Sequence, residues 1–500
     1  MDAFTNLMAG LEAALQPINF FYCFIGTLLG TLLGVLPGIG PLAGIALLLP
    51  LTYGLTPTAA MILLAGVYYG CQYGGSTTSI LMNVPGEVSS IVTCLDGNKM
   101  AKQGRAGAAL GIAAFGSFIA GTGGVVGLML ISVPVAKVTV KFGPPEFFSL
   151  MVLAIVILTS ISRGSTAKAM IMAVLGFILS FIGIDPVSGR ERLTFGSIQL
   201  TSGIELSSLA IGLFGVSEML INMEESIETT AIQLKQKIKG YLPTLKDWRM
   251  SAGPITRGTI VGFVTGTIPG GGAIVASFVS YALEKRLSKH PEKFGTGTIE
   301  GVAGPESANN SATSGAFIPL LTMGIPSNVI MALLLGALMI HGIRPGPLFL
   351  VEHKDIFWAV IGSMYIGNVM LLVLNLPLIP LWVQLLKVPN RILLPTILLI
   401  CVIGSYSVNN NVFDILVMAL AGIAGYVLRK SGYEVAPLCL AFVLGPTMEN
   451  SFRQALIMSD GSFSIFVTRP IAAVTLAFAA LALGVLAIKG RKIPGVQLDT

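Results

Sequence analysis

The 500-residue sequence has few charged side chains and no familiar catalytic motif. Asp, Glu, Lys and Arg make up 11% of its residues, whereas soluble domains carry about 25%. Its three histidines form no metal-like cluster, and its five cysteines include no CxxC pair. The patterns HExxH, GxSxG and GxxxxGK[ST] are absent. Nothing in the sequence therefore indicates an enzyme, a resident metal or cofactor, or direct ATP coupling.

Hydrophobic residues take the place of the missing charge. They make up 54% of the chain, and the mean hydropathy is +0.83. Apolar runs close to the length that crosses a bilayer as a helix recur throughout; they are 107–135, 147–161, 204–222, 357–386, 412–428 and 471–488. The pattern predicts an all-α polytopic membrane protein with about 11–13 membrane segments. The net charge of +6 fits short loops beside a lipid bilayer and does not indicate a nucleic-acid partner.

Three matched sequence pairs indicate an internal repeat. GTLLGVLPGIG (30–40) aligns with GFVTGTIPGGG (262–272), ILMNVPG (80–86) with LTMGIPS (321–327), and MAVLG (172–176) with MALAG (418–422). The pairs keep the same order, at offsets of 232, 241 and 246 residues. An internal duplication explains this better than chance.

The repeat divides the chain into five parts. We expect membrane repeats at 17–222 and 254–453, with a polar cytoplasmic linker at 223–253 between them. Residues 1–16 are expected to form an N-terminal interfacial segment, because they lack the basic start of a signal peptide. Residues 454–500 are expected to form a final transmembrane helix and a basic tail.

The distribution of Lys and Arg favours inverted repeats. With five crossings after a broken hairpin in each half, the predicted cytoplasmic loops hold 22 Lys and Arg and the outer loops hold 8. Turning the second half over gives about 15 on each side, which the positive-inside rule disfavours. We therefore expect the N-terminus outside and the C-terminus in the cytoplasm. The long segments 57–97 and 294–340 could each contain a further re-entrant turn.

Pro and Gly interrupt an apolar segment at matched places in both halves. The interruptions contain Pro37, Gly38 and Gly40 in the first half, and Pro269, Gly270, Gly271 and Gly272 in the second. Unpaired backbone groups cannot face lipid, so such breaks belong beside a polar cavity or at a re-entrant tip. Helix N-termini there could face an anion, and free carbonyls could hold a cation. A structural kink or a close helix crossing is the alternative.

A polar cluster precedes a second break in each half. The first cluster is Ser76, Thr77, Thr78, Ser79 and Asn83, before Pro85-Gly86. The second is Ser307, Asn309, Asn310, Ser311, Thr313 and Ser314, before Pro326-Ser327. Their hydroxyl and amide groups could bind carboxylate oxygens or an alkali cation. Solvated loops are the alternative, although each cluster runs directly into apolar sequence.

Two carboxylates lie close to these motifs. Glu306 falls within the second cluster, and Glu87 follows the second break of the first half. Either could be a functional group inside the membrane or an ordinary interfacial residue. No Lys or Arg lies within the four motifs. Asn368, Asn375 and Asn409–Asn411 are lesser candidates, better suited to hydrogen bonds between helices.

The four motifs together resemble the large membrane subunit of the bacterial tripartite tricarboxylate transporters. The resemblance is carried by GTLLGVLPGIGP, YYGCQYGGSTTSILMNVPGE, GTIPGGGAIVASFVSYALEK and GPESANNSATSGAFIPLLTMGIPS, and it covers about residues 17–455. It implies a secondary transporter of the inner membrane that imports citrate-like di- or tricarboxylates. It also implies a periplasmic solute-binding protein, a small membrane subunit and a driving cation gradient.

The residues favour Na⁺ over H⁺ as the coupling ion. Na⁺ needs only neutral oxygens, which the breaks could supply, whereas proton coupling usually needs a titratable group inside the membrane. A self-sufficient carboxylate symporter, or a channel without a binding protein, is the alternative function. A channel would show a continuous polar pore in place of paired breaks.

Overall fold

The protein is built almost entirely of helices. The computed structural model describes residues 3–36, 40–161, 165–185, 187–224, 242–268, 270–385 and 390–489. Within them, five helices are long and apolar enough to span a membrane, and five shorter apolar helices accompany them. Strands β1 (Gly183–Ile184) and β2 (Glu191–Arg192) form a small antiparallel hairpin. The predicted all-α polytopic membrane architecture is confirmed.

The first half runs from an N-terminal helix to the start of the predicted linker. Its helices are α1 (Ala3–Leu15), α2 (Pro17–Val35), α3 (Gly40–Leu48), η1 (Pro50–Gly54), α4 (Pro57–Met82), η2 (Val88–Ser90), α5 (Ile91–Met100), η3 (Ala101–Arg105), α6 (Ala106–Thr139), α7 (Pro144–Ile161), α8 (Thr166–Ser180), α9 (Ile198–Thr201), α10 (Leu206–Ala210), η4 (Ile211–Val216) and α11 (Ser217–Glu224). Most of the predicted linker, 225–241, lies outside the described residues.

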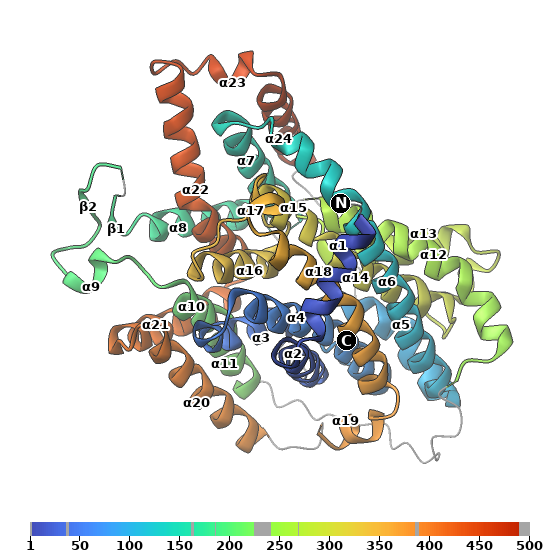
Figure 1. The fold of residues 1–500 in the computed structure, drawn as a ribbon. Coiled ribbons are helices and arrows are strands. Elements are labelled where there is room, and N and C mark those ends of the chain that lie inside the picture. The colour runs from blue at the N-terminus through green and yellow to red at the C-terminus, as the bar shows by residue number, and fades with distance from the viewer. Residues whose placement is uncertain are drawn as a thin grey trace.

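The second half begins with α12, whose first turn lies within the predicted linker. Its helices are α12 (Leu245–Thr267), α13 (Gly272–Leu287), η5 (Pro291–Lys293), α14 (Glu300–Gly315), α15 (Phe317–Met323), α16 (Val329–Ile340), α17 (Phe349–Glu352), α18 (Lys354–Asn375), α19 (Ile379–Leu385), α20 (Asn390–Asn409), α21 (Val412–Lys430) and α22 (Ala436–Met458). Helices α23 (Ile465–Thr468) and α24 (Pro470–Lys489) follow. Figure 1 shows α4 and α14 inside the bundle, while α23 projects at the top.

Both halves contain the predicted helix breaks. Helix α2 ends at Val35 before α3 begins at Gly40, and α12 ends at Thr267 before α13 begins at Gly272. The second breaks follow α4 and α15, which end on left-handed residues, Asn83 (φ 59°) and Gly324 (φ 70°). These caps are 241 residues apart, the same offset as the sequence match that contains them. Gly adopts this conformation freely and Asn tolerates it, so the chain can reverse at both places.

The two halves use the same close helix crossing. On α2, Gly26, Gly30 and Gly34 lie against backbone carbonyls of α4, and on α12, Gly258, Gly262 and Gly266 lie against those of α14. A Cβ added to any of these six glycines would lie 2.1–2.5 Å from a carbonyl oxygen. Small residues spaced four apart let two helices approach this closely along one face.

Packing between the halves is reciprocal. Helix α4 packs against α18 of the second half, and α14 packs against α6 of the first. In the same manner α3 contacts α16 while α13 contacts α5, and α8 contacts α22 while α21 contacts η4. In each pair of contacts, the two elements of one contact correspond to the two elements of the other under the repeat offsets found in the sequence. The polar segments of α4 and α14 are thereby buried in the middle of the protein.

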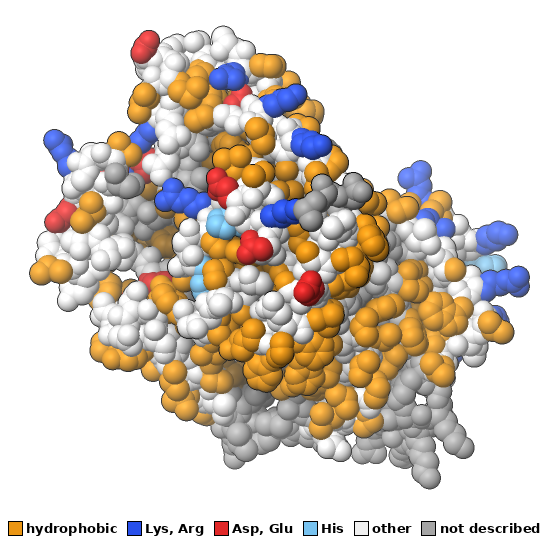
Figure 2. All heavy atoms as spheres, in the orientation of Figure 1, with side chains coloured by type: hydrophobic (Ala, Val, Ile, Leu, Met, Phe, Trp, Pro, Cys, Tyr) orange, Lys and Arg blue, Asp and Glu red, His pale blue; other side chains and the backbone are white. Residues whose placement is uncertain are grey.

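The outer surface is largely apolar. Figure 2 shows hydrophobic side chains across most of the visible face, with Lys and Arg near its right edge and upper part. Helix α1 packs against α18, where Gly10 meets the Trp358 carbonyl. Its buried residues are Gly10 and Ala14, while Phe4 and Leu15 remain exposed. A broad apolar exterior is what contact with lipid requires.

Candidate functional site

The predicted polar clusters lie inside helices rather than in solvated loops. Ser76, Thr77 and Thr78 belong to α4 and are at most 5% exposed. Every residue of α14 from Gly301 to Gly315 is buried, including its polar residues. Buried polar groups of this kind need partners, because an unpaired one costs about 1–3 kcal/mol. The partners show what each residue does.

Glu306 is held by hydroxyl groups from the first half. Its side chain is 1% exposed. One oxygen accepts a 2.5 Å hydrogen bond from Ser76 Oγ, and the other accepts one from Thr93 Oγ1 of α5. No Lys or Arg is paired with it among the described residues. A carboxylate inside a membrane protein and bound only to hydroxyls is a candidate cation or proton site.

One site lies at the start of α3 and is called the first-break site, after the break between α2 and α3 in the first half. It comprises Gly40, Gln72, Glu87 and Asn309. The Asn309 amide donates a 3.1 Å hydrogen bond to Glu87 Oε1, and Ser89 Oγ donates to the same oxygen. Glu87 also accepts from the backbone N–H of Ser90, which caps η2. In the amide orientation that satisfies its neighbours, Gln72 donates to Glu87 as well. The start of α3 lies alongside, since a Cβ at Gly40 would be 3.9 Å from the Glu87 Cβ.

The corresponding site at the start of α13 is called the second-break site, after the break between α12 and α13 in the second half. It comprises Tyr68, Gly272, Thr313, Ser327 and Asn328. The two breaks of this half touch, because the Gly270 N–H donates a 2.6 Å hydrogen bond to the Ser327 carbonyl. Asn328 caps α16 through the Met331 N–H, at 2.9 Å, and its amide lies 3.5 Å from the Tyr68 hydroxyl. A Cβ at Gly272 would lie 3.4 Å from the Asn328 amide nitrogen. Thr313, whose hydroxyl donates a 3.1 Å hydrogen bond to the Asn309 carbonyl, lies next to Tyr68.

The two sites are equivalent under the 241-residue offset. The offset relates Glu87 to Asn328, Asn309 to Tyr68, and Gln72 to Thr313. In both sites the central helix of one half reaches the second break of the other half. The charges differ, however, because Asn328 replaces Glu87, and Ala65 stands at the position related to Glu306. The acidic groups are thus confined to the first-break side.

Several predicted site residues make hydrogen bonds between helices. Thr78 donates to the Val35 carbonyl at 2.6 Å, Asn310 to Ser117 at 2.7 Å, and Ser311 to the Thr259 carbonyl at 2.7 Å. These bonds join α4 to α2 and α14 to α6 and α12. The Ser307 hydroxyl is buried beside α6 without a partner in the described chain.

The remaining predicted residues lie at or near the breaks. Gly271 caps α13, Pro326 is buried before Ser327, and Pro85 is half-buried before Glu87. Asn83 is exposed at the end of α4. Pro37, Gly38 and Pro269 lie outside the described residues.

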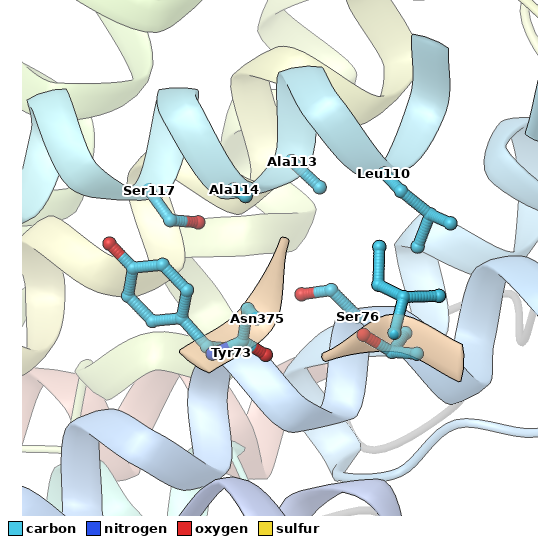
Figure 3. A pocket seen from close by; sticks show the side chains of 9 residues that line it. Tyr73, Ser76, Leu110, Ala113, Ala114, Ser117 and Asn375 are labelled. Carbon is cyan, nitrogen blue, oxygen red and sulfur yellow. The ribbon is translucent and has the colours of Figure 1, made fainter. Parts of the chain in front are cut away.

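A small cavity, lined in part by the Glu306 partner Ser76, lies on the side of α4 that faces α6. Its volume is about 10 Å³, near the minimum for one water molecule. Figure 3 shows Tyr73 and Ser76 facing Ser117, Ala114, Ala113 and Leu110 across it, and Thr77 also lines it. Asn375 contributes a buried amide oxygen without a partner among the described residues. Asn368 acts as predicted, joining helices through Tyr73 at 2.7 Å and Thr122 at 2.9 Å.

Asp96 ties α5 to the loop that leads into α14. It is fully buried and accepts hydrogen bonds of 2.8–3.0 Å from the backbone N–H groups of Gly295, Gly297 and Thr298. The Tyr281 hydroxyl of α13 donates to it at 2.9 Å. Because Thr93, one turn earlier on α5, holds Glu306, this helix fixes both the start and the middle of α14.

Sequence reasoning missed several of these residues. Tyr68 and Gln72 precede the polar cluster of α4 by one or two helical turns, among apolar residues that conceal them. Thr93 and Asp96 lie beyond the second break, in a segment without a matching polar pattern in the other half. Asn328 directly follows the motif that ends at Ser327, and its offset from Glu87 was the available signal. No group of three His, Cys, Asp or Glu side chains suited to a metal ion occurs in the described parts of the chain.

Comparisons with known proteins agree with the motif resemblance. A 52.8 kDa protein in the TAR-I ttuC' 3' region of Agrobacterium vitis is 51% identical over 477 residues, 95% of each chain. A protein in the TAR-II ttuC' 3' region of the same organism is 50% identical over 236 residues, which is 47% of this chain and 96% of that protein. No solved structure matches significantly. The tripartite tricarboxylate transporter TctA family matches residues 20–440, so this chain belongs to that family of membrane transport proteins.

Proposed function

We propose that this chain is the large membrane subunit of a transporter that imports small di- or tricarboxylates across the bacterial inner membrane. A cation gradient drives import, a periplasmic solute-binding protein delivers the substrate, and a small membrane subunit completes the assembly. Family membership supports the general role. The family's description as tripartite tricarboxylate transporters supports the proposed substrate class and partners.

The observation that carries the proposal is the environment of Glu306. This carboxylate is buried between the halves and bound by Ser76 and Thr93 of the first half. Charged groups inside a membrane are costly and mark transport pathways or ion sites. Here the group joins two helices whose breaks lie nearby, so movement of one half against the other would change its surroundings.

Na⁺ is the proposed coupling ion. The first-break side offers hydroxyls, amide oxygens and the carboxylates of Glu87 and Glu306, all oxygen groups that suit a hard cation. A bound cation there would also offset part of the charge of an anionic substrate. The buried carboxylates equally suit proton uptake, so proton coupling is the second candidate.

Uptake into proteoliposomes that contain the chain, its small membrane subunit and its binding protein tests the proposal. Labelled succinate, malate, tartrate and citrate are supplied with a Na⁺ gradient or a pH gradient imposed separately. We expect uptake of at least one carboxylate under the Na⁺ gradient alone, and none without the binding protein. Uptake by this chain alone would favour the self-sufficient symporter.

The Glu306→Gln variant separates the two coupling ions. It keeps the shape of the side chain and removes its charge, and Glu352→Gln, at an exposed position of α17, is the matched control. Transport driven by a pH gradient in sodium-free buffer, and lost in Glu306→Gln only, would make Glu306 the proton carrier and overturn the choice of Na⁺.

A further inference from the structure

The N-terminus of α13 lies at the second-break site, and no side chain of its own first turn caps it. Its cap residue, Gly271, has no side chain that could accept a hydrogen bond, and its first turn contains no acidic residue. Gly272 and Ala273 are buried there. The first N–H groups of a helix need acceptors, and the helix dipole favours a negative one. A buried helix N-terminus of this kind is therefore suited to an anion.

A second group at the same junction also lacks a partner. Ser327 is 1% exposed, and its hydroxyl makes no hydrogen bond within the described chain. Its carbonyl is bonded to the Gly270 N–H, which fixes it next to the start of α13. A buried hydroxyl without a partner costs free energy unless a ligand or water satisfies it.

The first-break site shows what the same geometry accepts. There Glu87 stands beside the start of α3, since a Cβ at Gly40 would lie 3.9 Å from the Glu87 Cβ. Its carboxylate is bound by Ser89, Asn309 and the Ser90 N–H. The related residue in the second-break site is the neutral Asn328. The protein therefore supplies its own carboxylate at one of two equivalent places and none at the other.

We propose that the second-break site binds a carboxylate group of the transported anion, at the N-terminus of α13 and the hydroxyl of Ser327. The first-break side, with Glu87 and Glu306, takes the coupling cation. This inference rests on the proposed function, because it assigns the two ligands of that function to two places. The carboxylates of Glu87 and Glu306 would repel an anion on the first-break side more strongly than one in the second-break site, which has no acidic side chain of its own among the described residues.

Binding of the four carboxylates to the chain purified in detergent tests the assignment directly, because uptake would also reflect affinity for the binding protein. Asn328→Asp places a fixed carboxylate beside α13 while still capping α16, since Asp is also a good N-cap. We expect it to weaken carboxylate binding on the order of 100-fold, through like-charge repulsion. Ser327→Ala removes one hydrogen bond to a charged group, so we expect a loss of ~10-fold.

Ser132→Ala is the matched control. Ser132 on α6 is equally buried and also lacks a hydrogen-bond partner in the described chain, but it lies outside both sites. Its variant should bind like the unchanged protein. Glu87→Gln should shift the Na⁺ dependence of binding while carboxylate affinity at saturating Na⁺ changes less than about threefold.

The outcomes separate this inference from the proposed function. Unchanged carboxylate affinity in both Asn328→Asp and Ser327→Ala, with both variants monodisperse, overturns the assignment while the transporter proposal stands. Weaker carboxylate binding in Glu87→Gln alone would move the anion to the first-break side. If the unchanged protein neither binds nor transports any of the four carboxylates, the proposed function fails first and the assignment fails with it.

Discussion

The Ser76 hydroxyl on α4 donates a 2.5 Å hydrogen bond to Glu306 on α14. This bond joins a hydroxyl from one predicted repeat to a carboxylate from the other. Helices α4 and α14 are also the two that hold the break sites, through Tyr68 and Asn309. Their relative position therefore sets the geometry around Glu306.

Ser76→Ala should lower the transport rate by about tenfold, since a hydrogen bond to a charged group contributes about 1.5–3 kcal/mol. Thr93 remains as a donor to Glu306, so a partial loss is expected. Initial uptake rates per amount of reconstituted protein measure the effect. Ser407→Ala, on an exposed face of α20, is the control and should transport normally. Equal rates in both variants would show that the bond is not needed.

Gly270→Val should abolish transport. Gly270 has φ +81°, and a Cβ there would lie 2.4 Å from Ile157 Cγ2 and 3.0 Å from the Leu158 nitrogen. A β-branched residue cannot adopt this backbone readily, so the break and its contact with α7 should be distorted. Uptake and membrane abundance are measured together. Gly346→Val is the control, because nothing lies within 4 Å of a Cβ there and its φ is not positive.

A normally transporting Gly270→Val protein would reduce the second-half break to a simple kink. Gly38→Val is expected to act in the same way in the first half. That expectation rests on the sequence match alone, since Gly38 lies outside the described residues.

Asp96→Asn should loosen the loop before α14. The carboxylate accepts hydrogen bonds from three backbone N–H groups and from Tyr281, whereas an amide offers one acceptor oxygen and adds donors. Amide hydrogen exchange across 291–300 should become faster. Asp355→Asn, exposed in the first turn of α18, should leave that exchange unchanged. Identical protection in the two variants would show that Asp96 does not hold the loop.

The sequence predicted the breaks because they need residues with rare backbone freedom. Gly270, Gly272 and Gly324 adopt positive φ, and Pro and Gly are visible in any sequence. Asn83 and Gly324 occupy the same position of the aligned motifs, but their left-handed caps were not predicted. The family also followed from these motifs, and the comparisons confirm it.

The pairing of the halves could not be predicted in the same way. Contacts such as Ser76 with Glu306, or Asn309 with Glu87, join residues more than 200 positions apart. They depend on which helix faces are buried, and periodicity is weak in helices that are apolar all round. For the same reason Thr78, Asn310 and Ser311 could not be distinguished by sequence from the residues that face the breaks.

Asp185 gives a prediction with a defined pH dependence. The Ser188 hydroxyl, the Val187 N–H, and Arg453 and Arg192 hold its pKa well below the ordinary value for Asp. A lowered pKa means that the carboxylate stabilises the loop fully above pH ~4 and loses this effect as the pH falls further. Exchange protection of 183–194, corrected for intrinsic rates, should therefore stay constant between pH 7 and pH 5.

Asp185→Asn should lower that protection already at pH 7, because Arg192 and Arg453 lose one of the two carboxylates they share and keep only Glu449. Asp460→Asn is the control, in an exposed turn where Asn suits the positive φ of 47°. Protection that falls between pH 7 and pH 5, or that is unchanged in Asp185→Asn, would contradict the role of this carboxylate.

The proposed orientation can be tested with two single cysteines. His290, in the basic loop after α13, is 62% exposed, and Val351 on α17 is 76% exposed. The 22-to-8 division of Lys and Arg places the first in the cytoplasm and the second outside. A membrane-impermeant maleimide should therefore label Val351→Cys from the outer face and His290→Cys only after the inner face is opened. The native cysteines should give a low background, because four are buried and Cys94 is half-buried. Labelling of His290→Cys from outside, with the membrane intact, would rule out the inverted arrangement of the two repeats.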